Sequence, residues 1–268
     1  MLRQLALSIG LLAASFLTSQ SAQAEDYSTV AQVEFLTGWT TKSGTQMAGL
    51  SITLEPGWKT YWRKPGEAGI PPVFNWGGSQ NLQSVAMHWP TPTVFRQNEY
   101  HSVGYSERLI LPIELSPSQA SAPIVVQGTL QLGVCREVCV PVTLNIDQEG
   151  AEVGTAAIQQ ALANAPISRQ KAGVGKVTCE ITPISDGLRM TVRMKSPHLG
   201  GNEHMVVELP DPTIWISEAA THREGGYLIA SVDMVPEYAA PFSLDRSDVR
   251  VTLLGSKVAV DIQGCSGG

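Results

Sequence analysis

Apolar residues between Ala31 and Ile146 occur in short alternating or β-branched runs, and Gly, Pro, Asn and Ser separate these runs. The clearest runs cover residues 48–54, 108–115, 124–132 and 140–146. Turn sequences such as Glu55-Pro56-Gly57 and Lys64-Pro65-Gly66 lie between the strand-like segments. Many short strands at this spacing predict an antiparallel β-sandwich in the first half of the chain.

The pattern changes after residue 150. Residues 155–163 are rich in Ala, Gln and Leu and predict one short helix that ends before Pro166, and the polar residues 168–175 are typical of a linker. Strand-like runs then resume at residues 177–184, 188–194, 205–209, 227–234, 249–254 and 258–262. We therefore expect an all-β chain with two antiparallel β-sandwich domains, at residues 25–150 and 176–268, joined by a helix and linker at residues 151–175.

Residues 1–24 have the three parts of a secretory signal peptide. Arg3 provides the positive start, residues 5–17 form an apolar stretch too short to span a bilayer, and Ala22-Gln23-Ala24 fits the small-x-small cleavage rule. No later segment has about eighteen consecutive apolar residues. The sequence therefore predicts an exported chain with no membrane insertion after the signal is removed.

Charge narrows the classes of partner. The 268 residues carry a formal charge of −6, with 16% charged residues and no basic run of five or more. A nucleic-acid surface or a polybasic membrane patch needs such a run, so neither is expected. Proteins or small molecules are the expected partners.

The four cysteines form two different pairs. Cys135 and Cys139 flank Arg136-Glu137-Val138 between two strand-like runs, so a hairpin would make them cross-strand neighbours with Cα atoms about 4.5 Å apart, at the short end of disulfide geometry. Closing so short a loop constrains the unfolded chain by only about 2 kcal/mol. Cys179 and Cys265 stand at the two ends of the second β region, where a bridge would contribute about 4.6 kcal/mol. We predict a structural disulfide between Cys179 and Cys265.

Cys135 and Cys139 have little stabilising reason to be bonded, which leaves redox exchange and a second structural bridge as interpretations of comparable weight. Arg136 favours a thiolate and Glu137 opposes it, so the neighbouring residues do not decide which sulfur attacks.

Roughly residues 30–147 contain a series of aromatic, proline, glycine and cysteine motifs. They are, in order, the run from Gly57 through Trp58, Tyr61, Trp62 and Lys64-Pro65-Gly66 to Pro71, then Asn75-Trp76, Trp89-Pro90, Gly104-Tyr105, Leu111-Pro112 and Cys135-Arg136-Glu137-Val138-Cys139-Val140-Pro141. These motifs, in this order, resemble the N-terminal periplasmic domain of DsbD-like and ScsB-like thiol:disulfide interchange proteins. The remainder, up to Cys265, resembles the companion β region of longer members.

The resemblance implies a periplasmic, immunoglobulin-like domain in which Cys135 and Cys139 pass reducing equivalents. The implied partners are a membrane-embedded thiol electron relay and periplasmic thioredoxin-like proteins. We expect no cofactor and no metal. The family's transmembrane relay and its thioredoxin-like domain are not found in this sequence, so we expect a protein that depends on a separate relay.

Two other classes remain open. A C-x-x-x-C pair followed by Pro also resembles Sco-type copper chaperones, and Met87, His88 and His101 are candidates to complete a copper site. However, the five histidines show no metal-ligand spacing by themselves. The other class is a noncatalytic β-sandwich adaptor with two inert bridges. No Gly-x-Ser-x-Gly elbow, P-loop or His-Glu-x-x-His motif supports a hydrolase.

Aromatic residues offer two further candidate features. Trp58, Tyr61 and Trp62 are either a partner-docking face or, as we favour, part of the sandwich core. Residues 100–105, with Tyr100, His101 and Tyr105, are a candidate cap loop over the thiols, and an ordinary surface loop is the alternative.

Overall fold

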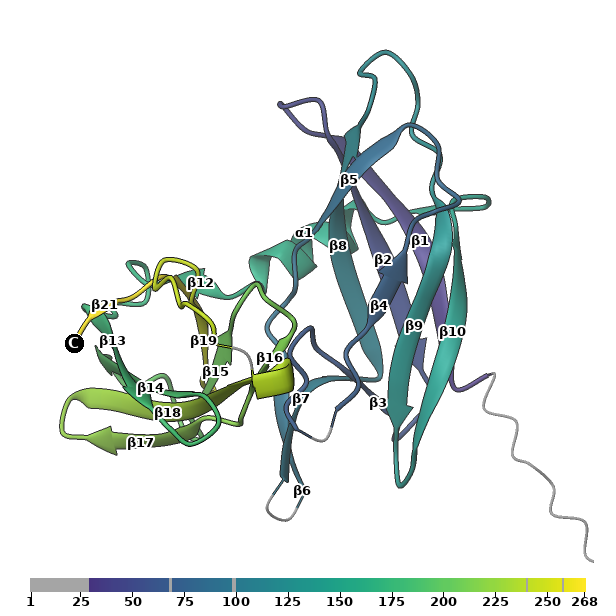
Figure 1. Cartoon of the computed structure of the whole chain (residues 1–268). Helices are drawn as coiled ribbons and strands as arrows, with labels where there is room; N and C mark the ends of the chain where they lie inside the picture. The colour runs from purple at the N-terminus through teal and green to yellow at the C-terminus, as the bar shows by residue number, and fades with distance from the viewer. Residues whose placement is uncertain (1–28, 68, 98–99, 240, 257) are drawn as a thin grey trace, which may run out of the picture.

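The chain folds into two β-sandwich domains that lie side by side (Figure 1). The computed structural model describes residues 29–268 except residues 68, 98–99, 240 and 257. The predicted signal peptide, residues 1–24, lies outside the described residues. The predicted all-β fold is confirmed, because strands dominate both domains and α1 is the one α-helix in the described part of the chain.

The first domain packs two sheets face to face. Sheet 1 has the strand order β11 (Glu152–Val153), β1 (Ala31–Thr40), β2 (Gln46–Leu54), β8 (Arg108–Pro117), β5 (Leu82–Met87). Sheet 2 has the order β10 (Cys139–Asp147), β9 (Gln127–Cys135), β3 (Lys59–Tyr61), β7 (Tyr100–Ser106), β6 (Thr93–Gln97), and β4 (Val73–Asn75) also pairs with β9. The core between them is continuous and apolar, and includes Leu50, Ile52, Trp62, Leu111, Leu130 and Val134.

The second domain repeats this two-sheet plan with different strands. Sheet 3 has the order β12 (Ile167–Ser168), β20 (Ala259–Gln263), β19 (Arg250–Leu254), β15 (His204–Glu208). Sheet 4 has the order β16 (Ile214–Ile216), β18 (Tyr227–Pro236), β14 (Leu188–Lys195), β13 (Val177–Pro183), β21 (Ser266–Gly267), and β17 (Ala220–Glu224) also pairs with β18. A 3₁₀ turn, η1 (Glu237–Ala239), follows β18.

A disulfide joins Cys179 of β13 to Cys265, with the Cα atoms 5.8 Å apart. The disulfide connects the C-terminal residues to β13, and β21 also pairs with β13. Strand pairing is antiparallel except at short edge contacts, which are β1 with β11, β12 with β20, and β13 with β21.

The helix α1 (Thr155–Ala163) occupies the residues that the sequence indicated, and it packs on sheet 1. Its buried Ile158 contacts Leu36 and Met47. A Cβ atom at Gly49 would lie 2.9 Å from Cγ1 of Ile158, so glycine allows the helix to approach the sheet. No helix in the described residues is long and apolar enough to cross a membrane.

Residues 168–175 differ from the open linker that their polarity suggested. They form hydrogen-bonded turns, in which Ala172 N–H donates to Ser168 O and Val174 N–H donates to Arg169 O. Val174 is buried in the core of the second domain, and Gly175 N–H donates to Lys195 O. The apolar Val174 therefore anchors this segment to the second sandwich.

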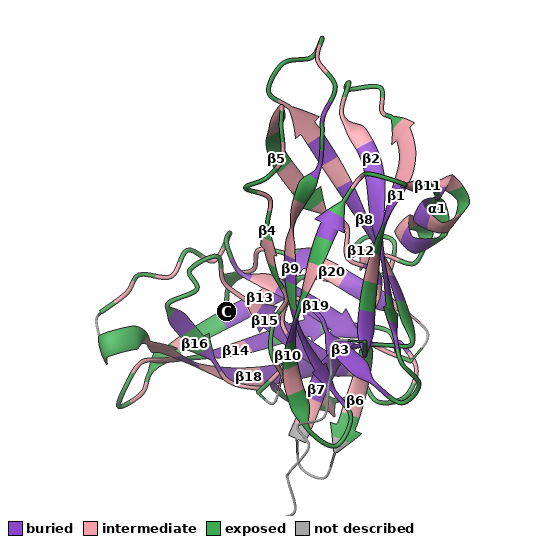
Figure 2. Cartoon of the chain, turned by 90° about the vertical axis from the view of Figure 1, so that its right-hand side faces the viewer, coloured by how far each residue is buried: buried purple, intermediate pink, exposed green. Residues whose placement is uncertain are grey.

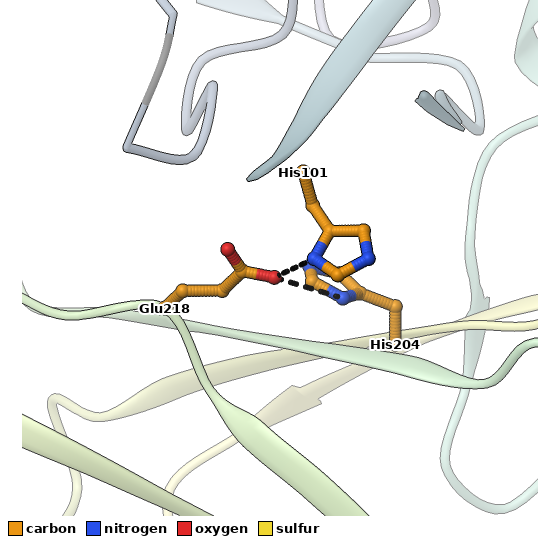
Figure 3. A group of neighbouring side chains, drawn as sticks. All are labelled: His101, His204 and Glu218. Carbon is orange, nitrogen blue, oxygen red and sulfur yellow. Dashed lines mark ion pairs between the residues drawn. The ribbon is translucent and has the colours of Figure 1, made fainter. Parts of the chain in front are cut away.

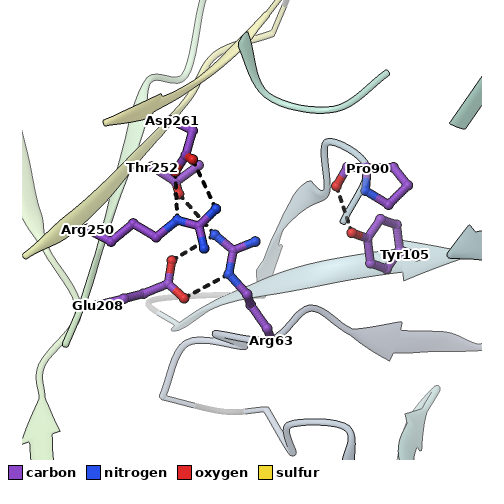
Figure 4. Close-up of polar contacts among 7 residues, drawn as sticks. All are labelled: Arg63, Pro90, Tyr105, Glu208, Arg250, Thr252 and Asp261. Atoms are coloured by element: carbon purple, nitrogen blue, oxygen red, sulfur yellow. Dashed lines mark hydrogen bonds and ion pairs between the residues drawn. The ribbon is translucent and has the colours of Figure 1, made fainter. Parts of the chain in front are cut away.

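The two domains are joined by contacts as well as by the chain. Nε and Nη2 of Arg63, which follows β3, each lie 2.9 Å from an oxygen of Glu208 at the end of β15 (Figure 4). Beside this pair, Arg250 binds Asp261 through two hydrogen bonds. Val206, Leu254 and Ala259 of sheet 3 pack with the first domain's core, and Figure 2 shows buried strands where the domains meet.

Candidate functional site

Cys135 and Cys139 form a disulfide at the tip of the β9–β10 hairpin. They are directly opposed in the strand register, with Cα atoms 4.1 Å apart. The three intervening residues form a tight loop, in which Arg136 N–H donates to Val138 O at 3.1 Å. The chain therefore holds the two sulfurs together before any partner arrives.

The two cysteines differ in exposure. Cys135 is only 2% exposed, because it lies within β9 between neighbouring strands, whereas Cys139 is exposed at the start of β10. A macromolecular thiol can therefore reach Cys139 and cannot directly reach Cys135.

Tyr61 links β3 to this disulfide. Its hydroxyl donates a hydrogen bond to Sγ of Cys135 at 2.8 Å and also lies 3.4 Å from Sγ of Cys139. Side chains alternate along a strand, so Tyr61 lies on the opposite face of β3 from Thr60. Burial raises the pKa of the Tyr61 phenol, so the group stays protonated and remains a donor.

Lys59 adds positive charge on the same face as Tyr61. It is directly opposite Cys135 in the β3–β9 register, and its Nζ donates to Oγ of Ser102 at 3.2 Å. The ring of Phe95 lies 5.2 Å from Nζ, and burial lowers the pKa of the Lys59 amine. These two contacts of Nζ therefore lie on β7 and β6, across β3 from the strand that carries Cys135.

The segment after β3 covers this face. A Cβ atom at Gly69 would lie 2.8 Å from Cδ1 of Tyr61 and 2.4 Å from Cβ of Pro65, and one at Gly133 would lie 2.5 Å from Cβ of Ile70. These close approaches require glycine at both positions. The chain around Pro65 and Ile70 therefore shields Tyr61, and with it the buried sulfur, from solvent.

The prediction that residues 100–105 form a cap loop over the thiols is wrong. These residues lie in strand β7, which pairs with β3 and β6 and so satisfies its backbone hydrogen bonds within the sheet. Tyr105 points into the core, where its hydroxyl donates to Pro90 O at 2.8 Å, it stacks on Trp89, and burial raises its pKa (Figure 4). Of Tyr100, only the backbone is described.

His101 faces the second domain instead of the cysteines. Its Nδ1 contacts Oε1 of Glu218, and its ring centroid lies 5.6 Å from that of His204 (Figure 3). Burial, with smaller contributions from the charges of His101 and Arg96, lowers the pKa of His204 to about 4. The imidazole of His204 is therefore neutral at pH 7.

The structure does not gather the copper ligands considered from the sequence. Met87 ends β5 in sheet 1, and Nε2 of the adjacent His88 lies 3.3 Å from Oε2 of Glu114. His101 lies on sheet 2 and pairs with a different carboxylate, Glu218.

The aromatic run belongs mainly to the core. Trp58 and Trp62 are buried in the first domain, as the core interpretation indicated. The guanidinium of Arg136 lies 5.2 Å from the centre of the Trp58 ring, so the loop of the β9–β10 hairpin contacts Trp58. Sequence reasoning missed the separate role of Tyr61, although strand alternation between Thr60 and Tyr61 was a signal that could have revealed it.

Comparison with known proteins places this geometry in context. None of the curated protein sequences matches the chain. The crystal structure of the N-terminal periplasmic domain of ScsB from Proteus mirabilis is similar, with a TM-score of 0.64 and 22% sequence identity over 89% of this chain and 92% of that chain. At this identity, the likeness supports the two-domain fold alone.

The sequence model described as "Thiol:disulfide interchange protein DsbD, N-terminal" matches residues 28–149. The match spans the first sandwich and contains Tyr61 and both cysteines of the β9–β10 hairpin. Residues 28–149 are therefore similar to the N-terminal domain of DsbD-type thiol:disulfide interchange proteins.

Proposed function

We propose that this protein is exported to the periplasm, where Cys135 and Cys139 exchange electrons with other thiol proteins. The observation that carries the proposal is the asymmetry of the disulfide: Cys139 is exposed, whereas Cys135 is buried and accepts a hydrogen bond from Tyr61. An inert bridge needs no accessible sulfur beside a shielded one. Thiol–disulfide exchange needs an accessible sulfur that a partner thiolate can attack and a second sulfur that leaves as a thiolate.

In the reduction step, a partner thiolate attacks Sγ of Cys139. A new disulfide forms between the partner and Cys139, the bond between Cys139 and Cys135 breaks, and Cys135 leaves with the electron pair as a thiolate. A second partner thiolate then attacks the partner's sulfur in the mixed disulfide and releases Cys139 as a thiolate. The partner has been oxidised to a disulfide, and this protein has been reduced to a dithiol.

The Tyr61 hydroxyl stabilises the leaving sulfur. The Tyr61 hydroxyl already lies 2.8 Å from Sγ of Cys135, so its hydrogen bond strengthens as negative charge develops there. A better-stabilised leaving thiolate accelerates exchange.

The similar proteins support a proposal about the partners. The family name describes thiol:disulfide interchange, and the similar structure is a periplasmic domain. We infer that a membrane-embedded thiol relay reduces Cys135 and Cys139, and that periplasmic thioredoxin-like proteins accept the electrons. The signal peptide predicted at residues 1–24 is consistent with this location.

A redox titration tests the proposal. The purified oxidised protein is equilibrated with glutathione buffers of graded potential, and the free thiols are mapped by alkylation and mass spectrometry. We expect Cys135 and Cys139 to be reduced at a clearly higher potential than Cys179 and Cys265, which serve as the internal structural control. If both pairs resist glutathione equally, the adaptor class replaces the exchange function.

A further inference from the structure

Two histidines and one carboxylate from different domains meet at the domain interface (Figure 3). His101 lies on β7 of the first domain, His204 begins β15 of the second, and Glu218 lies between β16 and β17. One potential ligand atom from each residue lies within 4.8 Å of the other two. Oε1 of Glu218 is central, because it contacts Nδ1 of His101 and lies 4.0 Å from Nδ1 of His204.

The polar atoms of this cluster are incompletely satisfied. Nδ1 of His101 is buried and has no partner in hydrogen-bond geometry, although it touches the Glu218 carboxylate. His204 itself is only 7% exposed. A buried polar atom without a well-formed hydrogen bond requires an explanation, and binding of one ion by both groups, after they move apart, would provide one.

We propose that His101, His204 and Glu218 bind one divalent transition-metal ion of the Zn²⁺ class, which links the two domains. Imidazole nitrogen and carboxylate oxygen are ligands that such ions prefer. Zn²⁺ binds nitrogen at about 2.0–2.1 Å, which places the ligand atoms of one tetrahedral site about 3–4 Å apart. To reach that spacing, the side chains would have to rotate so that His101 and Glu218 separate and His204 approaches them.

Charge and access at the cluster suit a cation. Glu218 supplies the negative charge, and Oε1 of Glu67 accepts a hydrogen bond from the Glu218 backbone N–H at 3.2 Å. Arg96 is the cation whose charge reaches His204, and it opposes part of this attraction. His204 and Glu218 also line an interdomain cleft of about 460 Å³, through which an ion and a water ligand can enter.

The site is independent of the cysteine pair, because its ligands come from the interface. In strand β7, His101 is paired with Arg96 of β6, whereas Cys135 is opposite Lys59, whose β7 partner is Ser106 at the other end of that strand. Loss of metal binding and loss of thiol exchange are therefore separable outcomes.

The test uses the full-length mature protein, oxidised so that no thiolate competes for metal, and stripped with EDTA. Calorimetric titration with Zn²⁺ should show one ion per chain. His101→Gln and Glu218→Gln should each weaken binding by more than about tenfold, since even partners behind a metal ligand are worth roughly 10- to 100-fold in affinity. His222→Gln is the matched control, because His222 is also a histidine beside a carboxylate but is exposed, 3.5 Å from Glu224 on β17. The affinity of this variant for Zn²⁺ should equal that of the wild type.

A second readout separates a specific site from a folding defect. Zn²⁺ should raise the unfolding temperature of the wild-type protein and of His222→Gln, and should have little effect on His101→Gln or Glu218→Gln, whose folded state is checked by circular dichroism in EDTA. Co²⁺ should give the intense visible absorption of a low-symmetry site with nitrogen ligands in the wild type and in His222→Gln, and should not give it in His101→Gln or Glu218→Gln. Absence of stoichiometric Zn²⁺ binding, or equal affinity in all the variants, would overturn the proposal.

Discussion

The hydroxyl of Tyr61 lies 2.8 Å from Sγ of Cys135, and both residues are 2% exposed. The buried sulfur of the hairpin is thus the one that lies nearer to the Tyr61 hydroxyl, which is 3.4 Å from Sγ of Cys139. Because a buried thiolate without a donor would be costly, this contact decides how readily Cys135 can act as a leaving group.

Replacing Tyr61 with Phe should raise the pKa of the Cys135 thiol, because the thiolate loses a hydrogen bond that stabilises its charge. The measurement is a pH titration of thiolate absorbance in a Cys139→Ala background, so that one thiol of the pair remains. Tyr105→Phe is the control, since the Tyr105 hydroxyl binds Pro90 O in the core. Equal thiol pKa values in the two Phe variants would contradict the assigned role.

Cys139 should react first with thiol reagents. In the reduced protein, we expect a disulfide probe to modify Cys139 at least about tenfold faster than Cys135, because reactivity requires exposure as well as a thiolate. Cys135→Ala should therefore accumulate a mixed disulfide with a thioredoxin-like protein, whereas Cys139→Ala should trap it far more slowly. Stopped-flow kinetics and mass spectrometry measure both. Faster trapping through Cys135 would reverse the assignment.

Gly69→Ala should disturb the cover over Tyr61. The new methyl group would lie 2.8 Å from Cδ1 of Tyr61 and 2.4 Å from Cβ of Pro65, so the segment must move. Overpacking of this kind costs about 1–3 kcal/mol of unfolding free energy, and it should speed alkylation of Cys135. Gly201→Ala meets no atom within 4 Å and is the control. Urea denaturation should show a loss for Gly69→Ala alone; equal stability of the two variants would mean that Gly69 does not hold the cover in place.

Removal of the Cys179–Cys265 bridge should destabilise the second domain without affecting exchange. Replacing both with Ala should cost about 2–5 kcal/mol, because the bridge closes a loop with 86 residues of sequence separation. Thermal unfolding measures the loss, and the glutathione titration of Cys135 and Cys139 should be unchanged. A stability change below about 0.5 kcal/mol would show that strand pairing alone secures the C-terminus.

Glu208→Gln should loosen the two domains. It removes one charge from a two-point ion pair whose side chains are each 17% exposed, leaving Arg63 a 3.4 Å contact with Thr252. We expect a loss of about 1–3 kcal/mol, less than for a fully buried pair. Asp233→Asn breaks a two-point pair with Arg189 that is more exposed and lies within one domain, so it should cost less than about 1 kcal/mol. Chemical denaturation and small-angle X-ray scattering compare the two; a more extended shape is expected for Glu208→Gln alone.

The sequence by itself determined the strands, the helix and the cysteine hairpin, because these features depend on residues that are close together in the sequence. Alternating apolar runs and turn residues identify strands because a strand has one buried face, and the composition of residues 155–163 was sufficient to predict α1. The spacing of Cys135 and Cys139 likewise implied a hairpin pair, since three intervening residues leave few other arrangements.

Only the tertiary structure decided which distant side chains meet. Strand order places Tyr61 beside Cys135 and turns Tyr105 into the core, and local sequence gives no measure of such pairing. The contact of His101 with Glu218 depends on how two sandwiches dock, because the residues belong to separate domains. A local sequence pattern indicates which residues of one strand or helix are buried. A site is formed where several strands and helices pack together, and that packing depends on the interaction energies of the whole core.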